Sequence, residues 1–67
     1  MKIVYDKESD TITITLRDEQ IRESDEIRPG VIADFGYDGN VVRFEVLDAS
    51  RIVAEPQSIE YTSREVA

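Results

Sequence analysis

Residues 31–47 read VIADFGYDGNVVRFEVL, and this stretch decides the fold. It places Asp38-Gly39-Asn40 between two runs that are rich in β-branched and aromatic residues. Because Gly and Asn tolerate the positive φ that tight hairpin turns need, the pattern predicts two antiparallel strands joined at this turn. We expect Phe35 and Phe44 in the core. Alternate residues should share the faces of these strands: Val31, Ala33 and Phe35 in the first, and Val42, Phe44 and Val46 in the second.

A second hairpin is predicted upstream. Ile3-Val4-Tyr5 is a short apolar run, residues 11–16 (TITITL) alternate with period two, and the charged residues 6–10 form the turn between them. The alternation directs Ile12, Ile14 and Leu16 to the core and the threonines to the other face.

The two hairpins are separated by a charged segment. Residues 17–25 contain a single apolar side chain and are predicted to be a solvated connection. Glu26-Ile27-Arg28 should be extended, and Pro29-Gly30 after it suits a sheet edge or a kink.

The C-terminal part is predicted to hold one short helix. Asp48 is a candidate N-cap for a helix over residues 49–54, which Pro56 should stop through its restriction on Glu55. Residues 57–63 alternate weakly, which fits either a last strand or an ordered arm. We therefore expect a mainly β (α+β) fold: an antiparallel meander of about four strands with one short helix over residues 1–55, and a tail over residues 56–67.

The size of the chain limits its core. At 67 residues it is a single domain, and chains of this length bury only about 60% of their unfolded surface. Since Cys and His are both absent, disulfides and the usual structural zinc sites are excluded. Self-association is the remaining common remedy, so we expect a homo-oligomer, with a dimer favoured.

The net charge and the N-terminal sequence limit the expected classes of partner and the expected location of the chain. The formal net charge of −7 opposes binding to nucleic acids and to anionic membranes, and it permits a basic protein partner. The N-terminus turns polar after Tyr5, so neither a signal peptide nor a spanning helix is expected. A cytoplasmic location follows as the default expectation.

Carboxylates in two turns are the only metal-binding candidates. Asp6, Glu8 and Asp10 alternate as at the start of a calcium loop, but Thr11 stands where such a loop needs Gly. Asp38 lies in the other acidic turn. The more economical interpretation is that these carboxylates bond to local backbone groups, so we expect no metal and no cofactor.

No catalytic signature is present. The serines have no His to act as a base, and no glycine-rich phosphate loop occurs. Asp34 and Glu45 could face one another across their strands, but they are expected to be solvated charges on a sheet face, with Arg43 as a cross-strand partner. We therefore predict a chain that is not an enzyme.

Several segments together resemble the domain of unknown function 2283, a family of small, mostly prokaryotic, uncharacterised proteins. The likeness covers about residues 3 to 51 and is most specific in Pro29-Gly30-Val31 and in residues 45–50 (EVLDAS); Tyr5-Asp6-x-Glu8-x-Asp10 also fits. The chain departs from the family pattern at Arg43, where a glycine is expected. Because some relatives are encoded beside small toxin-like proteins, the resemblance implies an antitoxin-like role as one hypothesis.

The residues and the resemblance together favour a non-enzymatic protein-interaction module, such as an antitoxin-like or regulatory partner of a small basic protein. The alternative is a module for a small ligand or a divalent metal that uses Asp6, Glu8, Asp10 and Asp38, provided that the two acidic turns lie at the same end of the sheet.

Overall fold

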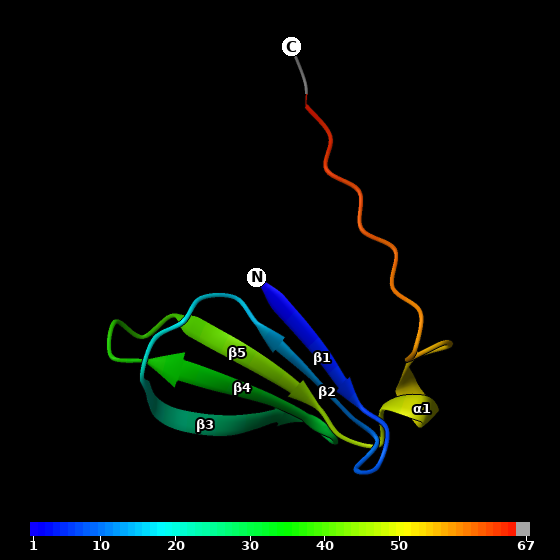
Figure 1. The fold of residues 1–67 in the computed structure, drawn as a ribbon. Helices are drawn as coiled ribbons and strands as arrows, with labels where there is room; N and C mark the ends of the chain where they lie inside the picture. Colours follow the sequence, from blue (N-terminus) through cyan, green and yellow to red (C-terminus); the bar gives the residue numbers. More distant parts are fainter. Residues whose placement is uncertain (66–67) are drawn as a thin grey trace.

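A computed structural model describes residues 1–65 and shows one antiparallel sheet with a short helix at one end (Figure 1). Every neighbouring pair of strands is antiparallel, and the strand order is β1-β2-β5-β4-β3. The prediction of a mainly β antiparallel fold is confirmed, with five strands in place of about four. In chain order the elements are β1 (Lys2–Asp6), β2 (Thr11–Thr15), β3 (Ile21–Arg28), β4 (Val31–Gly36), β5 (Val41–Val46) and α1 (Ala49–Ile52).

The sheet consists of two locally connected parts. β1 and β2 form the first hairpin, and β3, β4 and β5 form a meander. The two parts join where β2 pairs with β5, with Ile14 opposite Phe44. Residues 16–20 lead from β2 to the far edge of the sheet, where β3 begins (Figure 1). The predicted meander thus describes three of the strands, and the hairpin is added to it through β5.

The strand β3 corrects one prediction. Residues 17–25 were expected to be a solvated connection, but the chain is already extended from Ile21 and pairs with β4 as far as Arg28. β3 lies at the edge of the sheet, and all its residues except Ile21 are exposed. An edge strand can therefore carry charges at every position, which removes the alternation by which strands are recognised.

One face of the sheet is apolar. Cross-strand pairs place Ile3 opposite Ile14, which itself lies opposite Phe44. Only Ile12, Ala33, Val42 and Ala49 are buried among the apolar residues described, and Leu16, predicted as core, is exposed. We call this surface the apolar face and assign to it Ile3, Tyr5, Ile12, Ile14, Val31, Ala33, Val42, Phe44 and Val46.

The two phenylalanines are less buried than predicted. Both Phe35 and Phe44 are half-buried, because the short helix covers only one end of the sheet (Figure 1). A register shift after Asp34 also places Phe35 opposite Val41, so Phe35 does not continue the alternation of Val31 and Ala33. The bulge inserts one residue into β5 at this point, which the sequence pattern does not reveal.

The helix α1 is shorter than predicted. It ends at Ile52, and Val53 is extended (φ −101°, ψ 132°), so the chain leaves the helix before it reaches the residue restricted by Pro56. Asp48 occupies the N-cap position as expected, but its φ of 50° is left-handed and its side chain makes no capping hydrogen bond. A carboxylate from the β1–β2 turn acts in its place, as described below.

The turn between β4 and β5 uses one glycine. Gly39 has a φ of 83°, which explains why glycine stands there, whereas Asn40 does not adopt a positive φ. The Asp38 carboxylate accepts a hydrogen bond from the Asn40 backbone N–H at 3.0 Å, an interaction typical of Asx turns.

After α1 the chain forms an arm rather than a further strand. Residues 53–65 contain no strand and leave the sheet as an extended segment (Figure 1). The remaining two positions of the predicted tail, 66 and 67, lie outside the described residues. Within the part of the chain that the structure describes, no helix is long and apolar enough to cross a membrane.

Val42 provides a test of where the core lies. Its side chain is 2% exposed, so Val42→Ala should lower the free energy of unfolding by about 2 kcal/mol, measured by urea denaturation. Ile27→Ala removes a larger side chain that is 47% exposed and should cost less than half as much. A larger loss for Ile27→Ala than for Val42→Ala would contradict the placement of the core.

Candidate functional site

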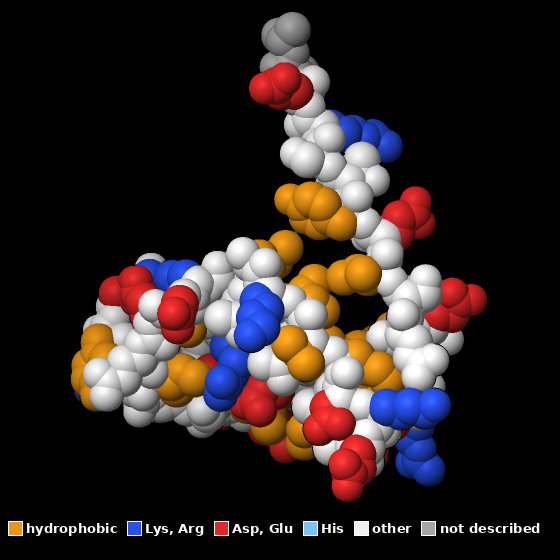
Figure 2. Space-filling model, viewed as in Figure 1, with side chains coloured by type: hydrophobic (Ala, Val, Ile, Leu, Met, Phe, Trp, Pro, Cys, Tyr) orange, Lys and Arg blue, Asp and Glu red, His pale blue; other side chains and the backbone are white. Residues whose placement is uncertain are grey.

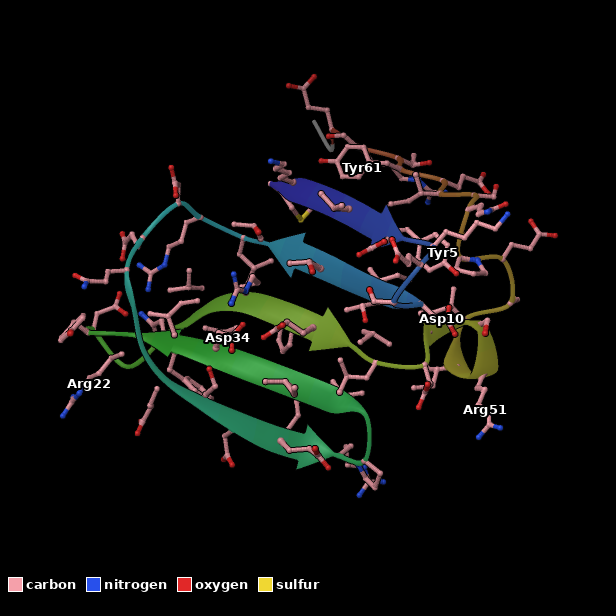
Figure 3. The ribbon with its side chains drawn as sticks, turned by 60° about the horizontal axis from the view of Figure 1, so that its bottom comes forward. Tyr5, Asp10, Arg22, Asp34, Arg51 and Tyr61 are labelled. Carbon is pink, nitrogen blue, oxygen red and sulfur yellow. The ribbon has the colours of Figure 1, made fainter. Side chains whose placement is uncertain are left out.

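A buried carboxylate lies in the middle of the face opposite the apolar face. Asp34 on β4 is fully buried, with 0% of its surface exposed, and Figure 3 shows it between the central strands. It pairs in register with Ser24 on β3 and with Arg43 on β5. The Ser24 hydroxyl donates to one carboxylate oxygen, and the Arg43 Nε donates to the other at 2.7 Å. Both oxygens of Asp34 are therefore satisfied across the sheet.

Glu45 completes this cluster. Its side chain is mostly buried and lies 3.6 Å from an Arg43 guanidinium nitrogen. The neighbouring Asp34 carboxylate, together with burial, raises the pKa of Glu45 above its ordinary value, although Arg43 acts in the opposite direction. Burial acts to raise the pKa of Asp34 as well, but the hydrogen bonds from Ser24 and Arg43 outweigh it and leave that pKa lowered. The two carboxyl groups are thus shifted in opposite directions, Asp34 toward its charged form and Glu45 toward its neutral form.

The geometry of this cluster suits a structural role. The prediction that Arg43 is a cross-strand partner of Asp34 is confirmed. The expectation of solvated charges is wrong for Asp34, which is fully buried where Ser24 and Arg43 on the two neighbouring strands bond to it. Because Asp34 is completely enclosed, a substrate has no access to it. An acid–base pair must reach the reacting atoms, and this one joins β3, β4 and β5 instead.

A second cluster joins the first hairpin to the helix α1. The Asp10 carboxylate accepts hydrogen bonds from the Tyr5 hydroxyl at 2.7 Å and from the backbone N–H and hydroxyl of Ser50 at 3.1 and 2.6 Å. The Asp10 carbonyl also accepts from the Ala49 N–H at 2.8 Å. Asp10 therefore caps α1 from a distance of 40 residues in sequence. We call Tyr5, Asp10 and Ser50 the clasp.

The clasp shifts two pKa values. The hydrogen bonds from Ser50 and Tyr5 lower the pKa of Asp10, and the hydrogen bond to Asp10 raises the pKa of Tyr5. Asp10 adopts a left-handed backbone with φ 52°, a conformation that Asp and Asn accept more readily than other residues apart from Gly. Sequence reasoning singled out Asp10 as a metal candidate and missed its capping of α1, since no spacing rule connects positions 10 and 50.

The other acidic turn residues serve their own turns. Asp6 accepts hydrogen bonds from the Glu8 N–H and the Ser9 hydroxyl. Asp38 binds Arg17 at 2.6 Å, and this contact, with the Asn40 N–H, brings the pKa of Asp38 far below its usual range.

The four metal candidates do not lie together. Because Ile12 pairs with Val46 and Thr15 pairs with Arg43, the turn before β2 and the turn before β5 lie at opposite ends of the sheet. Asp38 is thus remote from Asp6, Glu8 and Asp10, and the condition for the ligand-binding alternative is not met. Among residues 1–65, no group of three or more acidic residues is arranged to hold a metal ion.

A run rich in carboxylates leads into the exposed edge strand β3. The strand itself carries three carboxylates and two arginines, a net charge of −1. Residues 18–26 contain five carboxylates and one arginine, a net charge of −4 out of −7 for the chain. A groove lined by Glu23, Ser24, Asp25, Phe35 and Gly39 borders this edge, so an apolar ring lies beside the carboxylates. Arg22, the only basic residue of the segment, projects outward from the start of β3 (Figure 3). We call residues 18–26 the acidic edge. Sequence reasoning missed it because the segment was predicted to be a loop.

A family model described as a protein of unknown function (DUF2283) matches residues 2–50. The chain belongs to this family. The match extends from β1 to the first turn of α1 and includes the clasp and the buried Asp34 cluster, whereas the arm lies outside it. No significant match was found among curated proteins or among solved structures.

The raised pKa of Glu45 predicts a pH-dependent difference between the protein and its Glu45→Gln variant. A carboxyl whose pKa is raised by folding stabilises the native state below its unfolded pKa, near 4.5, and this stabilisation is lost as pH rises through the folded value. Glu45→Gln is neutral at every pH and removes this titration. The variant should match the wild type near pH 4 and exceed it at pH 7 by on the order of 1 kcal/mol, measured by urea denaturation at both pH values. A constant difference across this range would contradict the raised pKa of Glu45.

The clasp predicts an unequal effect of two serine substitutions. Ser50→Ala removes one of the hydrogen bonds to Asp10 and should lower the free energy of unfolding by about 1 kcal/mol. Ser9→Ala removes an exposed hydrogen bond to Asp6 in the neighbouring turn and should change it by less than about 0.5 kcal/mol. Equal losses measured by chemical denaturation would show that the clasp does not hold α1.

Proposed function

We propose that this chain is a non-enzymatic, cytoplasmic protein-interaction module that binds an extended basic segment of a small partner protein as an added strand beside β3. In this proposal the chain regulates its partner as an antitoxin does, by covering part of the partner's surface.

The observation that carries the proposal is the composition of an open strand edge. β3 has one neighbour in the sheet, β4, so a row of its backbone N–H and C=O groups faces outward. Extended segments bind to such rows by main-chain hydrogen bonds, and side chains beside the row select the segment. Here the exposed side chains of β3 include three carboxylates, Glu23, Asp25 and Glu26, which outnumber its two exposed arginines, Arg22 and Arg28.

The same charges explain selectivity. Two copies of the acidic edge repel each other, so the edge resists pairing with itself. A strand that carries Lys or Arg at alternate positions meets carboxylates instead, and Phe35 in the adjoining groove offers an apolar contact. The edge is therefore suited to a basic strand and unsuited to an acidic one.

A direct test uses synthetic peptides. A fluorescent peptide of alternating Lys and Val should bind, and the same peptide with Glu in place of Lys should not, measured by anisotropy. The triple variant E23Q/D25N/E26Q should weaken binding by about tenfold, since each exposed ion pair contributes about 0.5 kcal/mol. Binding should also weaken with added salt.

The matched control keeps the net charge of the variant and moves the changes away from β3. E8Q/E55Q/E60Q neutralises the same number of carboxylates in the β1–β2 turn and the arm, at positions that are also exposed. It should leave peptide affinity within about twofold of the wild type. An equal loss of peptide affinity in both triple variants would contradict a site at β3. The same conclusion would follow if peptide binding slowed amide hydrogen exchange in β1 and not in β3.

A further inference from the structure

The two edges of the sheet differ in chemistry. β3 carries three carboxylates and two arginines and is shared in part with the acidic edge, whereas β1, Lys2-Ile3-Val4-Tyr5-Asp6, carries one charge of each sign. Ile3 and Val4 are 39% and 45% exposed, and β1 likewise has a single neighbour, β2. The β1 edge therefore presents outward backbone groups together with apolar side chains and no net charge, which is the combination that favours strand pairing.

We propose that a second copy of this chain pairs antiparallel with β1, about a two-fold axis at Val4. In that register Lys2 of each copy lies opposite Asp6 of the other, and Ile3 lies opposite Tyr5. The Lys2–Asp6 pair then occurs twice in the interface, once on each side of the axis, as a self-complementary two-fold interface requires. Lys2 forms no salt bridge within residues 1–65, so it is available for this pair.

Only an axis at Val4, among the possible positions along β1, satisfies both the pleat and the charges. A shift of one residue would oppose side chains from different faces of the sheet, which the pleat forbids. Centring the pair on Ile3 or Tyr5 places Val4 opposite one of the charged residues and leaves the other charge without its match. Pairing about Val4 also continues the apolar face from one copy into the other, since Ile3 and Tyr5 belong to that face.

The arm adds a second observation at the same edge. Figure 2 shows it standing off from the sheet, with apolar side chains on both sides of the hollow between them. Grooves in this region are lined by Ile3, Tyr5, Pro56 and Ile59, and farther along by Met1 and Tyr61. Ile59 and Tyr61 remain 65% and 74% exposed. Ile3 and Tyr5 of the second copy would lie beside these grooves. The two arms could then cover the apolar side chains where the two β1 strands meet.

The experiment uses one charge reversal in each of two variants of the full chain. Lys2→Glu leaves two acidic residues at the ends of β1, and Asp6→Lys leaves two basic ones. Each variant alone should dissociate, with a dimer Kd about tenfold or more above the wild-type value by sedimentation equilibrium, because both cross-strand pairs become repulsive. Mixed together, the two variants should form a heterodimer of wild-type affinity, because each acidic end of one β1 strand then lies opposite a basic end of the other.

Matched controls separate this interface from other modes of assembly. Arg28→Glu and Glu26→Lys change the net charge by the same amounts on β3 and should leave the dimer unchanged. Circular dichroism checks that each variant folds, which matters for Asp6→Lys because Asp6 also holds its own turn. Recovery in the mixture excludes misfolding as the cause of dissociation.

Three results would overturn the proposal. The first is a wild-type chain that is monomeric at micromolar concentration. The second is a dimer whose Kd is unchanged by both charge reversals, which is the result that face-to-face packing of the apolar faces predicts. The third is a pair of single variants that do not associate when they are mixed. Peptide binding at the acidic edge is measured separately and does not depend on β1. The failure of either proposal is therefore distinguishable from the failure of the other.

Discussion

A single sheet without a second layer over it is the constraint on which this structure depends. A sheet with one apolar face ordinarily buries it against another layer, and here the only helix of the described residues has four residues. The buried apolar set is correspondingly small, and Phe44 and Ile14, in the middle of the apolar face, stay half-buried. The chain therefore needs stabilising contacts of other kinds.

Carboxylates supply many of these contacts. Asp10 joins the first turn to α1, Asp34 joins the strands of the meander, and Asp38 joins its turn to Arg17. Each accepts hydrogen bonds from groups in at least two elements or turns, so each restricts the chain as a crosslink would. Hydrogen bonds to charged acceptors are stronger than neutral ones, and this compensates in part for the thin core. An acidic composition thus contributes to the fold as well as to the surface.

The predictability of the fold differs along the chain for physical reasons. The hairpins over residues 2–15 and 31–46 were predictable because β-branched alternation and turn residues are local signals. β3 was not, since an exposed edge strand has no apolar period to detect. The end of α1 and the half-burial of Phe44 depend on which other parts of the chain cover them. A local sequence pattern does not show which side chains of a sheet will lack a second layer over them.

The candidate sites show the same division between local and distant contacts. Pairing of Arg43 with Asp34 followed from strand register, and the local role of Asp6 and Asp38 followed from turn chemistry. The contact of Asp10 with Ser50 could not be foreseen, because it joins segments that meet only in the complete fold. The acidic edge, on which the proposed function rests, became visible only when residues 21–28 proved to be a strand at the sheet boundary.

The way β2 meets β5 has a consequence for how the chain folds. The first hairpin and the three-stranded meander each contain mainly short-range contacts, so each can form early, while the β2–β5 ladder and the clasp close a loop of about 30 to 40 residues. Docking of these two preformed pieces is then the slow event. Leu16 and Arg17 take part in it through the Val42 carbonyl and Asp38, and residues 18–20 form the tether between the pieces. A chain cut in that tether would keep both pieces whole, and they could reassemble as a complementing pair of fragments.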